Sequence, residues 1–313
     1  MDMSAVDQDD LMRWAALIQQ DATSLESVSL DPDGIFQTRK TTMATVHQDV
    51  VDDLAAGFRC RGPDDFPLLI CGWGKSRVGS TALSNIFGMA GLPSYYQPLK
   101  AMLRNRLNDI RKASWCPPSA SLHSHLFSKE TAGPYLLAEC LFIPQKMLIE
   151  AGYPPDKLHL LLLDRQPVDC LNSWFARLSG RISRERLLRH HVLAALNVVR
   201  VEGYARRQGI PVTHYVHEAS KDAVASAQAL FLRLGLGDRF AEREVTDWED
   251  AGDLDSDRAK VIYPDEPSVF AVPGLHGAET GYRFQKHEVR PLGDDVMDLL
   301  TRHGLFESYQ RSV

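Results

Sequence analysis

The segment 72–81 of this chain, Gly-Trp-Gly-Lys-Ser-Arg-Val-Gly-Ser-Thr, combines glycine, hydroxyl and basic residues in a way that suits anion binding. It follows the apolar run 66–71 and precedes a helix-like segment. The backbone N–H groups and the dipole at a helix start both attract anions, and Gly79 allows a close backbone approach. The alternative is a glycine-containing turn with solvated basic side chains. The candidate anion contacts are Lys75, Arg77, Val78, Gly79, Ser80 and Thr81.

The same segment differs from the Walker P-loop of nucleoside-triphosphate-binding proteins. Gly74, Lys75 and Ser76 match the end of that pattern. The pattern also requires a glycine five positions before Gly74, where this chain has Leu69. The spacing therefore argues against a triphosphate site.

A second candidate for anion binding follows the apolar run 159–163. Arg165 stands where this predicted strand ends, and open α/β sheets bind ligands at the carboxyl ends of their strands. Pro167 suits the first turn of a helix, and Ser173 lies about two helical turns after Arg165. A guanidinium and a hydroxyl placed in this way can hold one phosphate. A structural pair of Asp164 and Arg165 is the alternative.

Alternating apolar runs and helix-period segments predict the fold class. Runs that are apolar throughout are typical of strands buried on both faces of a parallel sheet. Strands that alternate with helices predict a three-layer α/β/α fold with a central, mainly parallel sheet. We expect a helical N-terminal extension over 1–62 and an α/β domain over 63–313. The predicted strands are 66–71, 135–142, 159–163 and 210–216, and the clearest predicted helices are 181–207, 220–236 and 294–302.

Composition excludes several classes of protein. The 313 residues carry a formal net charge of −6, which is unlike the basic excess of most nucleic-acid binders. The acidic N-terminus lacks the features of a signal peptide, and no apolar run has the roughly 20 residues that cross a bilayer. The five scattered cysteines suggest neither a zinc site nor a disulfide framework. We expect a soluble cytoplasmic protein that binds neither nucleic acid nor membrane, and a homo-oligomer stays open.

The order of the two motifs resembles the sulfotransferases that use 3′-phosphoadenosine 5′-phosphosulfate (PAPS). In that family the first loop holds the 5′-phosphosulfate, and an Arg/Ser pair holds the 3′-phosphate. Arg77, Gly79, Ser80 and Thr81 fall on the first signature, and Val78 stands where Ser is commoner. The segment 210–220, with Glu218, is similar to a late strand of the family. The resemblance covers about residues 66–240.

This resemblance implies a P-loop-like sulfotransferase architecture and a metal-independent, in-line transfer that leaves adenosine 3′,5′-bisphosphate (PAP). Arg165 and Ser173 would hold the 3′-phosphate, far from the segment 72–81 that would hold the 5′-phosphosulfate. Arg77 would stabilise the departing phosphate oxygen. Arg283 and Lys286 would belong to the basic C-terminal loop that completes the 3′-phosphate site in the family.

The general base is less clear, because Gln97 stands where many relatives carry a glutamate. Gln97 and Tyr96 would at most orient the acceptor. Other branches of the family place a histidine at the carboxyl end of the strand before the Arg/Ser motif, which here is the predicted strand 135–142. Glu139 is therefore the first candidate base, followed by His125 and His123. A glutamate paired with a nearby cation, and ordinary loop histidines, are the alternatives.

The resemblance leads us to expect a sulfotransferase that modifies a hydroxyl or nitrogen of a soluble small molecule, as in metabolite or natural-product tailoring. A P-loop-type small-molecule kinase and a catalytically silent nucleotide-binding protein are the competing hypotheses. The kinase would need Mg²⁺ and a correctly spaced Walker lysine, whereas Gln97 is the main support for a silent protein.

Overall fold

The architecture comes from a computed structural model that describes residues 5–111, 115–248, 261–271, 282, 284 and 290–313. Arg283 and Lys286, the expected C-terminal contacts of the 3′-phosphate, lie outside the described residues.

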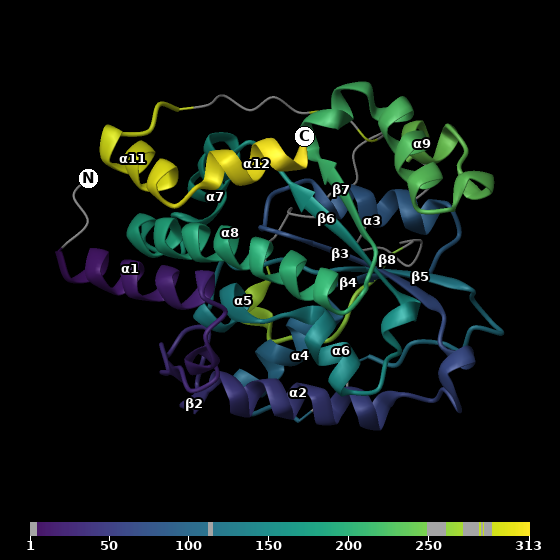
Figure 1. The fold of residues 1–313 in the computed structure, drawn as a ribbon, viewed down its shortest axis with the longest axis horizontal. Helices are drawn as coiled ribbons and strands as arrows, with labels where there is room; N and C mark the ends of the chain where they lie inside the picture. Colours follow the sequence, from purple (N-terminus) through teal and green to yellow (C-terminus); the bar gives the residue numbers. More distant parts are fainter. Residues whose placement is uncertain (1–4, 112–114, 249–260, 272–281, 283, 285–289) are drawn as a thin grey trace.

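Within the described residues, six parallel strands form one sheet in the order β7-β6-β3-β5-β4-β8 (Figure 1). The central strands are apolar and buried along most of their length, as a sheet covered on both faces requires. The predicted α/β fold with a central parallel sheet is confirmed. The strands are β3 (Leu68–Gly74), β4 (Ser94–Tyr96), β5 (His125–Lys129), β6 (Leu158–Asp164), β7 (Val212–Val216) and β8 (Val261–Ile262).

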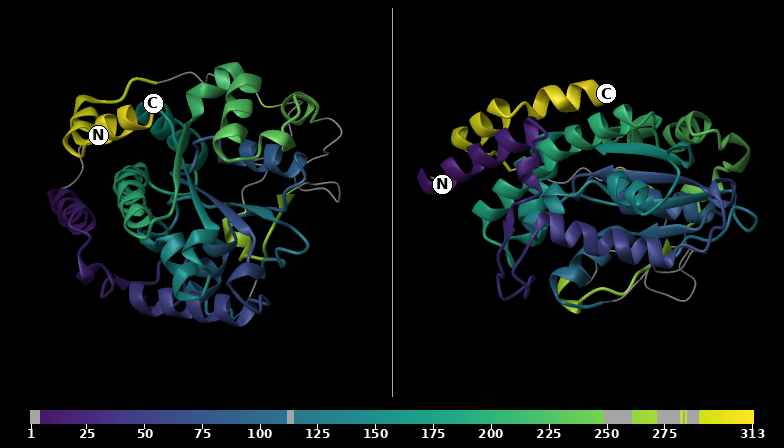
Figure 2. Two further views of the ribbon diagram at one scale, coloured as in Figure 1. Left: turned by 45° about the vertical axis from the view of Figure 1, so that its right-hand side comes forward. Right: turned by 60° about the horizontal axis from the view of Figure 1, so that its bottom comes forward.

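Helices cover both faces of this sheet, which completes the predicted three layers (Figure 2). On one face, α10 contacts both α3 and α9. On the other face, the long helix α8 contacts β3, β6 and β7, and it packs against α5, α6 and α7. The first group is α3 (Ser80–Met89), α9 (Ala223–Arg233) and α10 (Arg243–Thr246); the second is α4 (Pro98–Leu107), α5 (Leu137–Leu141), α6 (Pro144–Glu150), α7 (Pro167–Leu178) and α8 (Arg184–Arg207).

The N-terminal helices form an outer layer over the face that carries α8. Helix α1 (Ala5–Gln19) packs along α8, and α2 (Met43–Gly57) packs against α4 and α6. Between them, β1 (Ser29–Leu30) and β2 (Thr41–Thr42) pair antiparallel. Leu11 of α1 and Leu54 of α2 are fully buried in the same apolar cluster as the sheet. The N-terminal region therefore shares its core with the sheet.

The predicted strand 135–142 is wrong, because this run contains the short helix α5. The strand beside β3 is instead β5, ten residues earlier in the chain. A short apolar run reads alike as a strand or as a helix buried on all sides, and α5 is the latter, between α4 and α8. Pro134 and Pro144 flank the run, and the Glu139 carboxylate accepts the Tyr135 backbone N–H near the helix start. The C-terminal residues form α11 (Asp294–Arg302), as predicted, and α12 (Leu305–Ser312).

Chain topology brings the two candidate anion motifs together. The connection that leaves β3 leads to β4 on one side of the sheet, whereas β6 lies on the other side of β3 and leads outward to β7. Such a reversal is the topological switch point at which open α/β sheets bind ligands. Segment 75–79 follows β3 and Arg165 follows β6, so both motifs flank this point.

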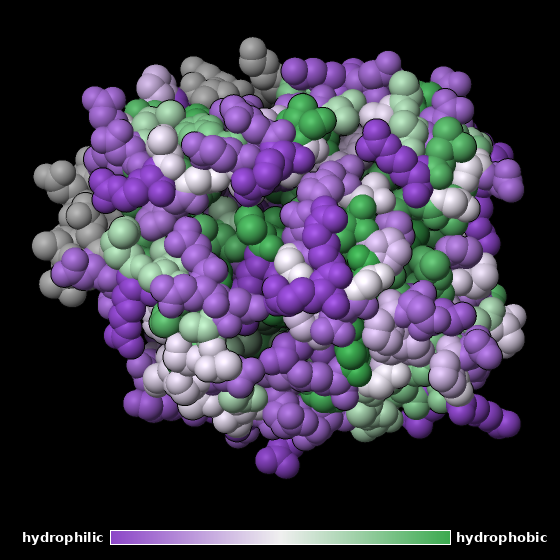
Figure 3. Space-filling model, in the orientation of Figure 1, coloured by the Kyte–Doolittle hydropathy of each residue, from purple (hydrophilic) through white to green (hydrophobic). Residues whose placement is uncertain are grey.

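The side of the molecule that carries α8 and α12 is mostly hydrophilic, with small separate apolar patches (Figure 3). Among the described residues, none of the helices has the length and apolar character that crossing a bilayer requires.

Candidate anion-binding site

The turn after β3 has an unusual backbone conformation. Arg77 has a φ of +72° and Gly79 a φ of +81°, both in the left-handed region. A non-glycine residue held there costs free energy, and such residues concentrate at functional sites. A Cβ atom on Gly79 would lie 2.6 Å from Nδ1 of His217, so only glycine fits. Gly79 precedes α3, whose first residues Ser80 and Thr81 have the free N–H groups of a helix start.

The turn after β6 leads directly into α7, as the sequence predicts. Pro167 is the first residue of this helix, and the Gln166 side chain accepts the Asp169 N–H as its cap. The Glu218 carboxylate accepts the Gln166 N–H at 3.1 Å, which fixes the backbone next to Arg165. Ser173, on the second turn of α7, is 8% exposed.

Side chains from the two motifs bind one another. Nε of Arg77 donates to Oγ of Ser173 at 3.1 Å, and Nη1 of Arg165 donates to the Arg77 carbonyl at 3.1 Å. The Trp174 indole also donates to the Ser76 carbonyl, at 2.7 Å. The expectation that the two motifs lie far apart is wrong, because β3 and β6 are neighbours in the sheet. We call Arg77, Arg165 and Ser173 the anion clamp.

The positive charges of the anion clamp lack counterions within the described part of the chain. Neither Arg77 nor Arg165 forms an ion pair there, although Arg165 is only 6% exposed. Nε of Arg165 is buried without a hydrogen-bond partner among the described residues. Burial, together with the nearby cations Arg177 and Arg165, lowers the pKa of Arg77. Two arginines arranged in this way favour the binding of an anion.

Lys75 takes a structural part instead. Its ammonium lies 2.5 Å from Oδ1 of Asp164, and both side chains are buried. Burial disfavours the ammonium, but the Asp164 carboxylate outweighs it and raises the pKa of Lys75. The pair joins the ends of β3 and β6. Val78 is also buried, at 2% exposure, so only its backbone is available to a ligand.

Lys129, at the carboxyl end of β5, is a candidate site residue that sequence reasoning missed. It pairs in register with Gly72 of β3 and Tyr96 of β4. Its ammonium lies 3.8 Å from the centre of the Tyr96 ring, a cation–π contact, and forms no hydrogen bond with a described residue. Burial lowers the pKa of Lys129 to about 7, and the positive charges of Arg104 and Arg77 contribute. A lysine that ends an apolar run was the available signal.

Tyr96 and Gln97 lie next to Lys129, but both are occupied by protein contacts. Tyr96 is 6% exposed and bonds the side chains of Gln97 and Thr81. Gln97 also accepts a hydrogen bond from the Thr131 hydroxyl at 3.0 Å. Its φ of +52° places it in the left-handed region before α4. These contacts orient both residues, and their expected part in acceptor binding stays a prediction.

The structure argues against Glu139 as the general base. Glu139 is fully buried; Oε1 accepts Nε of Arg104 at 2.7 Å, and Oε2 lies 3.6 Å from Nζ of Lys100. Burial alone would raise its pKa, but Arg104 and Lys100 outweigh burial and lower it. A carboxylate held in this way is a counterion and a weak base. The alternative of a paired glutamate therefore describes Glu139 better.

His125 and His123 are excluded by their position. His125 begins β5 and pairs in register with Leu68, the first residue of β3. The anion clamp follows the opposite end of β3, six residues beyond Leu68 and roughly 20 Å away at the rise per residue of a strand. His123 precedes His125 in an exposed turn. Neither imidazole can act on a group held at Arg77.

Trp73 and Trp174, the tryptophans nearest the two motifs in sequence, are core residues, so neither is free to stack on an adenine. Trp73 and Trp174 are both fully buried, and they pack edge-on against Phe142 and His191. In the described ranges, no group of three or more His, Cys, Asp or Glu side chains is placed to hold a metal ion. Comparisons with protein-family models, curated proteins and solved structures found no match to this chain.

Proposed function

We propose that this protein is a sulfotransferase that moves a sulfuryl group from PAPS to a hydroxyl or nitrogen of a soluble small molecule. The observation that carries the proposal is the direct contact between the two anion motifs, with two arginines that have no carboxylate partner among the described residues. The 3′- and 5′-phosphates of PAPS are attached to a single ribose. Two anion motifs in direct contact therefore suit this donor better than the two distant motifs expected from the sequence.

In this proposal the turn after β3 and the turn after β6 bind different phosphates of the donor. Arg165 and Ser173 bind the 3′-phosphate, while the N–H groups of Gly79, Ser80 and Thr81 bind the 5′-phosphosulfate. Arg77 belongs to the first turn and contacts Ser173, so it can stabilise the leaving phosphate oxygen. A sulfuryl group carries less charge than a phosphoryl dianion, so fixed cations can replace a metal ion.

Lys129 is the group best suited to the acceptor side. It lies on the strand next to β3, and a pKa of about 7 allows its amine to exchange protons near neutral pH. Its ammonium form would stabilise the transferring sulfuryl oxygens. Both roles need Lys129 near the reacting atoms, and Arg77 is close enough to contribute to its lowered pKa. Lys129 therefore replaces Glu139, His125 and His123 as our candidate for the general base.

Binding of PAP by calorimetry in EDTA tests the donor assignment. We expect binding without metal, and about a 100-fold weaker Kd for Arg165→Ala, because a charge-assisted phosphate contact is lost. Arg233→Ala, at an exposed site on α9, is the matched control. PAP that fails to bind, or that binds equally well to Arg165→Ala, would overturn the assignment.

The competing functions are separated by two further measurements. Stabilisation by ATP and Mg²⁺, but not by PAP, would favour the kinase. A mass gain of one sulfo group on any acceptor incubated with PAPS, lost in Arg77→Ala, would exclude a silent nucleotide-binding protein. PAP binding with no transfer in a broad acceptor screen would favour that silent protein.

A further inference from the structure

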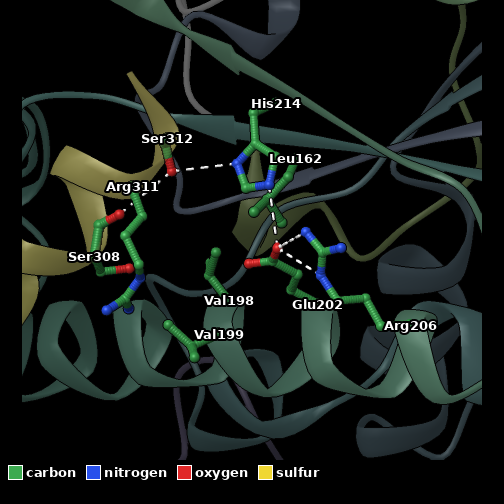
Figure 4. Close-up of a pocket in the computed structure, with 9 residues that line it drawn as sticks. All are labelled: Leu162, Val198, Val199, Glu202, Arg206, His214, Ser308, Arg311 and Ser312. Atoms are coloured by element: carbon green, nitrogen blue, oxygen red, sulfur yellow. Dashed lines mark hydrogen bonds and ion pairs between the residues drawn. The ribbon is translucent and has the colours of Figure 1, made fainter.

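A cleft of about 350 Å³, which shares no residue with the anion clamp, lies between α8, α12 and the β6–β7 edge of the sheet (Figure 4). Its volume falls within the range of small-molecule sites in proteins. Its apolar floor is formed by Leu162 of β6 together with Val198 and Val199 of α8. Val199 is 40% exposed although it is a large apolar residue. The floor can therefore bury the body of a small organic molecule.

One wall of the cleft is a chain of polar contacts. Oε1 of Glu202 lies 3.1 Å from Nε2 of His214 and accepts two hydrogen bonds from Arg206. Nδ1 of His214 lies 3.4 Å from Oγ of Ser312. The His214 hydrogen bond and Arg206 hold the pKa of Glu202 at about 2. The Glu202 charge is therefore already neutralised within this wall.

Arg311 forms the opposite wall and brings a second positive charge. Its side chain runs from α12 toward Val199 of α8 (Figure 4). Among the described residues, no carboxylate pairs with its guanidinium. With Arg206 matched by Glu202, Arg311 leaves the cleft with a net positive charge above an apolar floor. The Ser308 side chain, on the same helix, adds a hydroxyl group to the lining.

We propose that this cleft is a second ligand site, for a small organic carboxylate whose body is one ring or a short branched chain. The carboxylate pairs with Arg311, and the body lies on Leu162, Val198 and Val199. A hydroxyl on the ligand would reach the Glu202–His214–Ser312 wall. None of its residues belongs to the anion clamp, so this proposal does not rest on the proposed sulfuryl transfer.

The probe for this site is 4-hydroxybenzoate, with uncharged 4-hydroxybenzamide as its isostere. Calorimetry and ligand-observed NMR on the full chain, without nucleotide, should show at least about tenfold tighter binding of the carboxylate. Arg311→Ala should remove this preference. Arg302→Ala, at an exposed site on the neighbouring helix α11, is the matched control and should keep it. Equal binding of acid and amide, or no detectable binding of the acid, would overturn the proposal.

A second variant protects the test from effects on folding. Val199→Phe fills the floor from an exposed position, so the fold should tolerate it while probe affinity falls at least about tenfold. Saturating PAP should leave probe affinity unchanged. Displacement of the probe by PAP would place the probe in the anion clamp and reject the second site. Absence of PAP binding would count against the sulfotransferase but not against this cleft.

Discussion

Two buried groups of cations in this protein differ in how their charge is balanced. In the first, which we call the Glu139 cluster, Lys100 and Arg104 surround Glu139, and Arg104 also bonds Glu266 at 2.6 Å. In the second, the anion clamp, Arg77 and Arg165 contact only a hydroxyl and a carbonyl among the described residues. The first group carries its own counterions, whereas the second has none there.

The presence or absence of counterions distinguishes structural residues from ligand-binding residues better than burial does. Most side chains in both groups are buried, Arg77 is half-buried, and Glu139 is more deeply buried than Arg165. A buried ion pair that is complete stabilises only its surroundings, and breaking it is costly. A buried cation without a partner carries an uncompensated desolvation cost, which an anionic ligand would relieve. The anion clamp should therefore respond to ligand, and the Glu139 cluster to destabilising mutation.

The largest expected effect is on stability in the Glu139 cluster. Glu139→Gln keeps the shape of the side chain but leaves Lys100 and Arg104 without their shared carboxylate. We expect a loss of about 3–5 kcal/mol in the free energy of unfolding, measured by urea denaturation. Glu307→Gln, exposed on α12, should change it by less than about 0.5 kcal/mol. A stable Glu139→Gln protein that loses PAP binding would return Glu139 to the active site.

The next prediction reverses this result in the anion clamp. Arg77→Met removes a half-buried charge without a counterion at similar length, so the free energy of unfolding should not fall. PAP affinity should fall about 100-fold, because the guanidinium contact to the phosphosulfate end is lost. Denaturation and calorimetry on the same variant check both parts. A variant that is strongly destabilised yet binds PAP normally would show that Arg77 is a structural residue.

The elements that the sequence predicted are those whose pattern had one physical solution. The runs before Gly72 and Arg165 each lead directly into a turn and then a helix start, the pattern of a strand in an α/β fold, and both are strands of the sheet. The run 135–142 was compatible with either a strand or a buried helix. Because it was assigned as a strand, the inferences that depended on that strand were wrong. Glu139 was placed at a strand end that does not exist, and Lys129, which occupies the real one, was overlooked.

The distance in space between the two motifs could not be predicted from the sequence either. Residues 77 and 165 are separated by three strands along the chain, yet β6 returns to lie beside β3. Strand order is set by the packing of helices on both faces, and local patterns do not contain it. The residues of the clamp could thus be identified in advance, whereas their direct contact could not.

A smaller effect is expected at Gly79. Gly79→Ala places a methyl group at a φ of +81° and 2.6 Å from Nδ1 of His217. We expect a loss of about 1–3 kcal/mol in unfolding free energy, together with weaker PAP binding, because the turn must shift. Gly180→Ala, where nothing lies within 4 Å of the added Cβ, is the matched control. Unchanged PAP binding in a destabilised Gly79→Ala would detach this turn from the donor site.

The last prediction concerns a dependence of stability on pH at Lys129. Burial lowers the pKa of this lysine from 10.5 to about 7. Between these values the unfolded chain binds the proton that the folded protein has lost, so Lys129 makes stability rise as pH increases from about 7 toward 10.5. Lys100, with its pKa lowered to about 8, acts in the same direction, so the comparison must be with a variant.

Lys129→Met isolates this contribution. The variant should be more stable than the parent below about pH 7, where the parent buries a charged ammonium, and the difference should shrink as pH rises. Urea denaturation of both proteins at several pH values from 6 to 9 measures this difference in the free energy of unfolding. Steps of about one pH unit are sufficient, because a shift of one pKa unit corresponds to about 1.4 kcal/mol. A pH-independent difference would mean that Lys129 stays charged in the folded protein, paired with an anion. That result would make Lys129 resemble the Glu139 cluster and remove it from the proton transfer proposed for the acceptor.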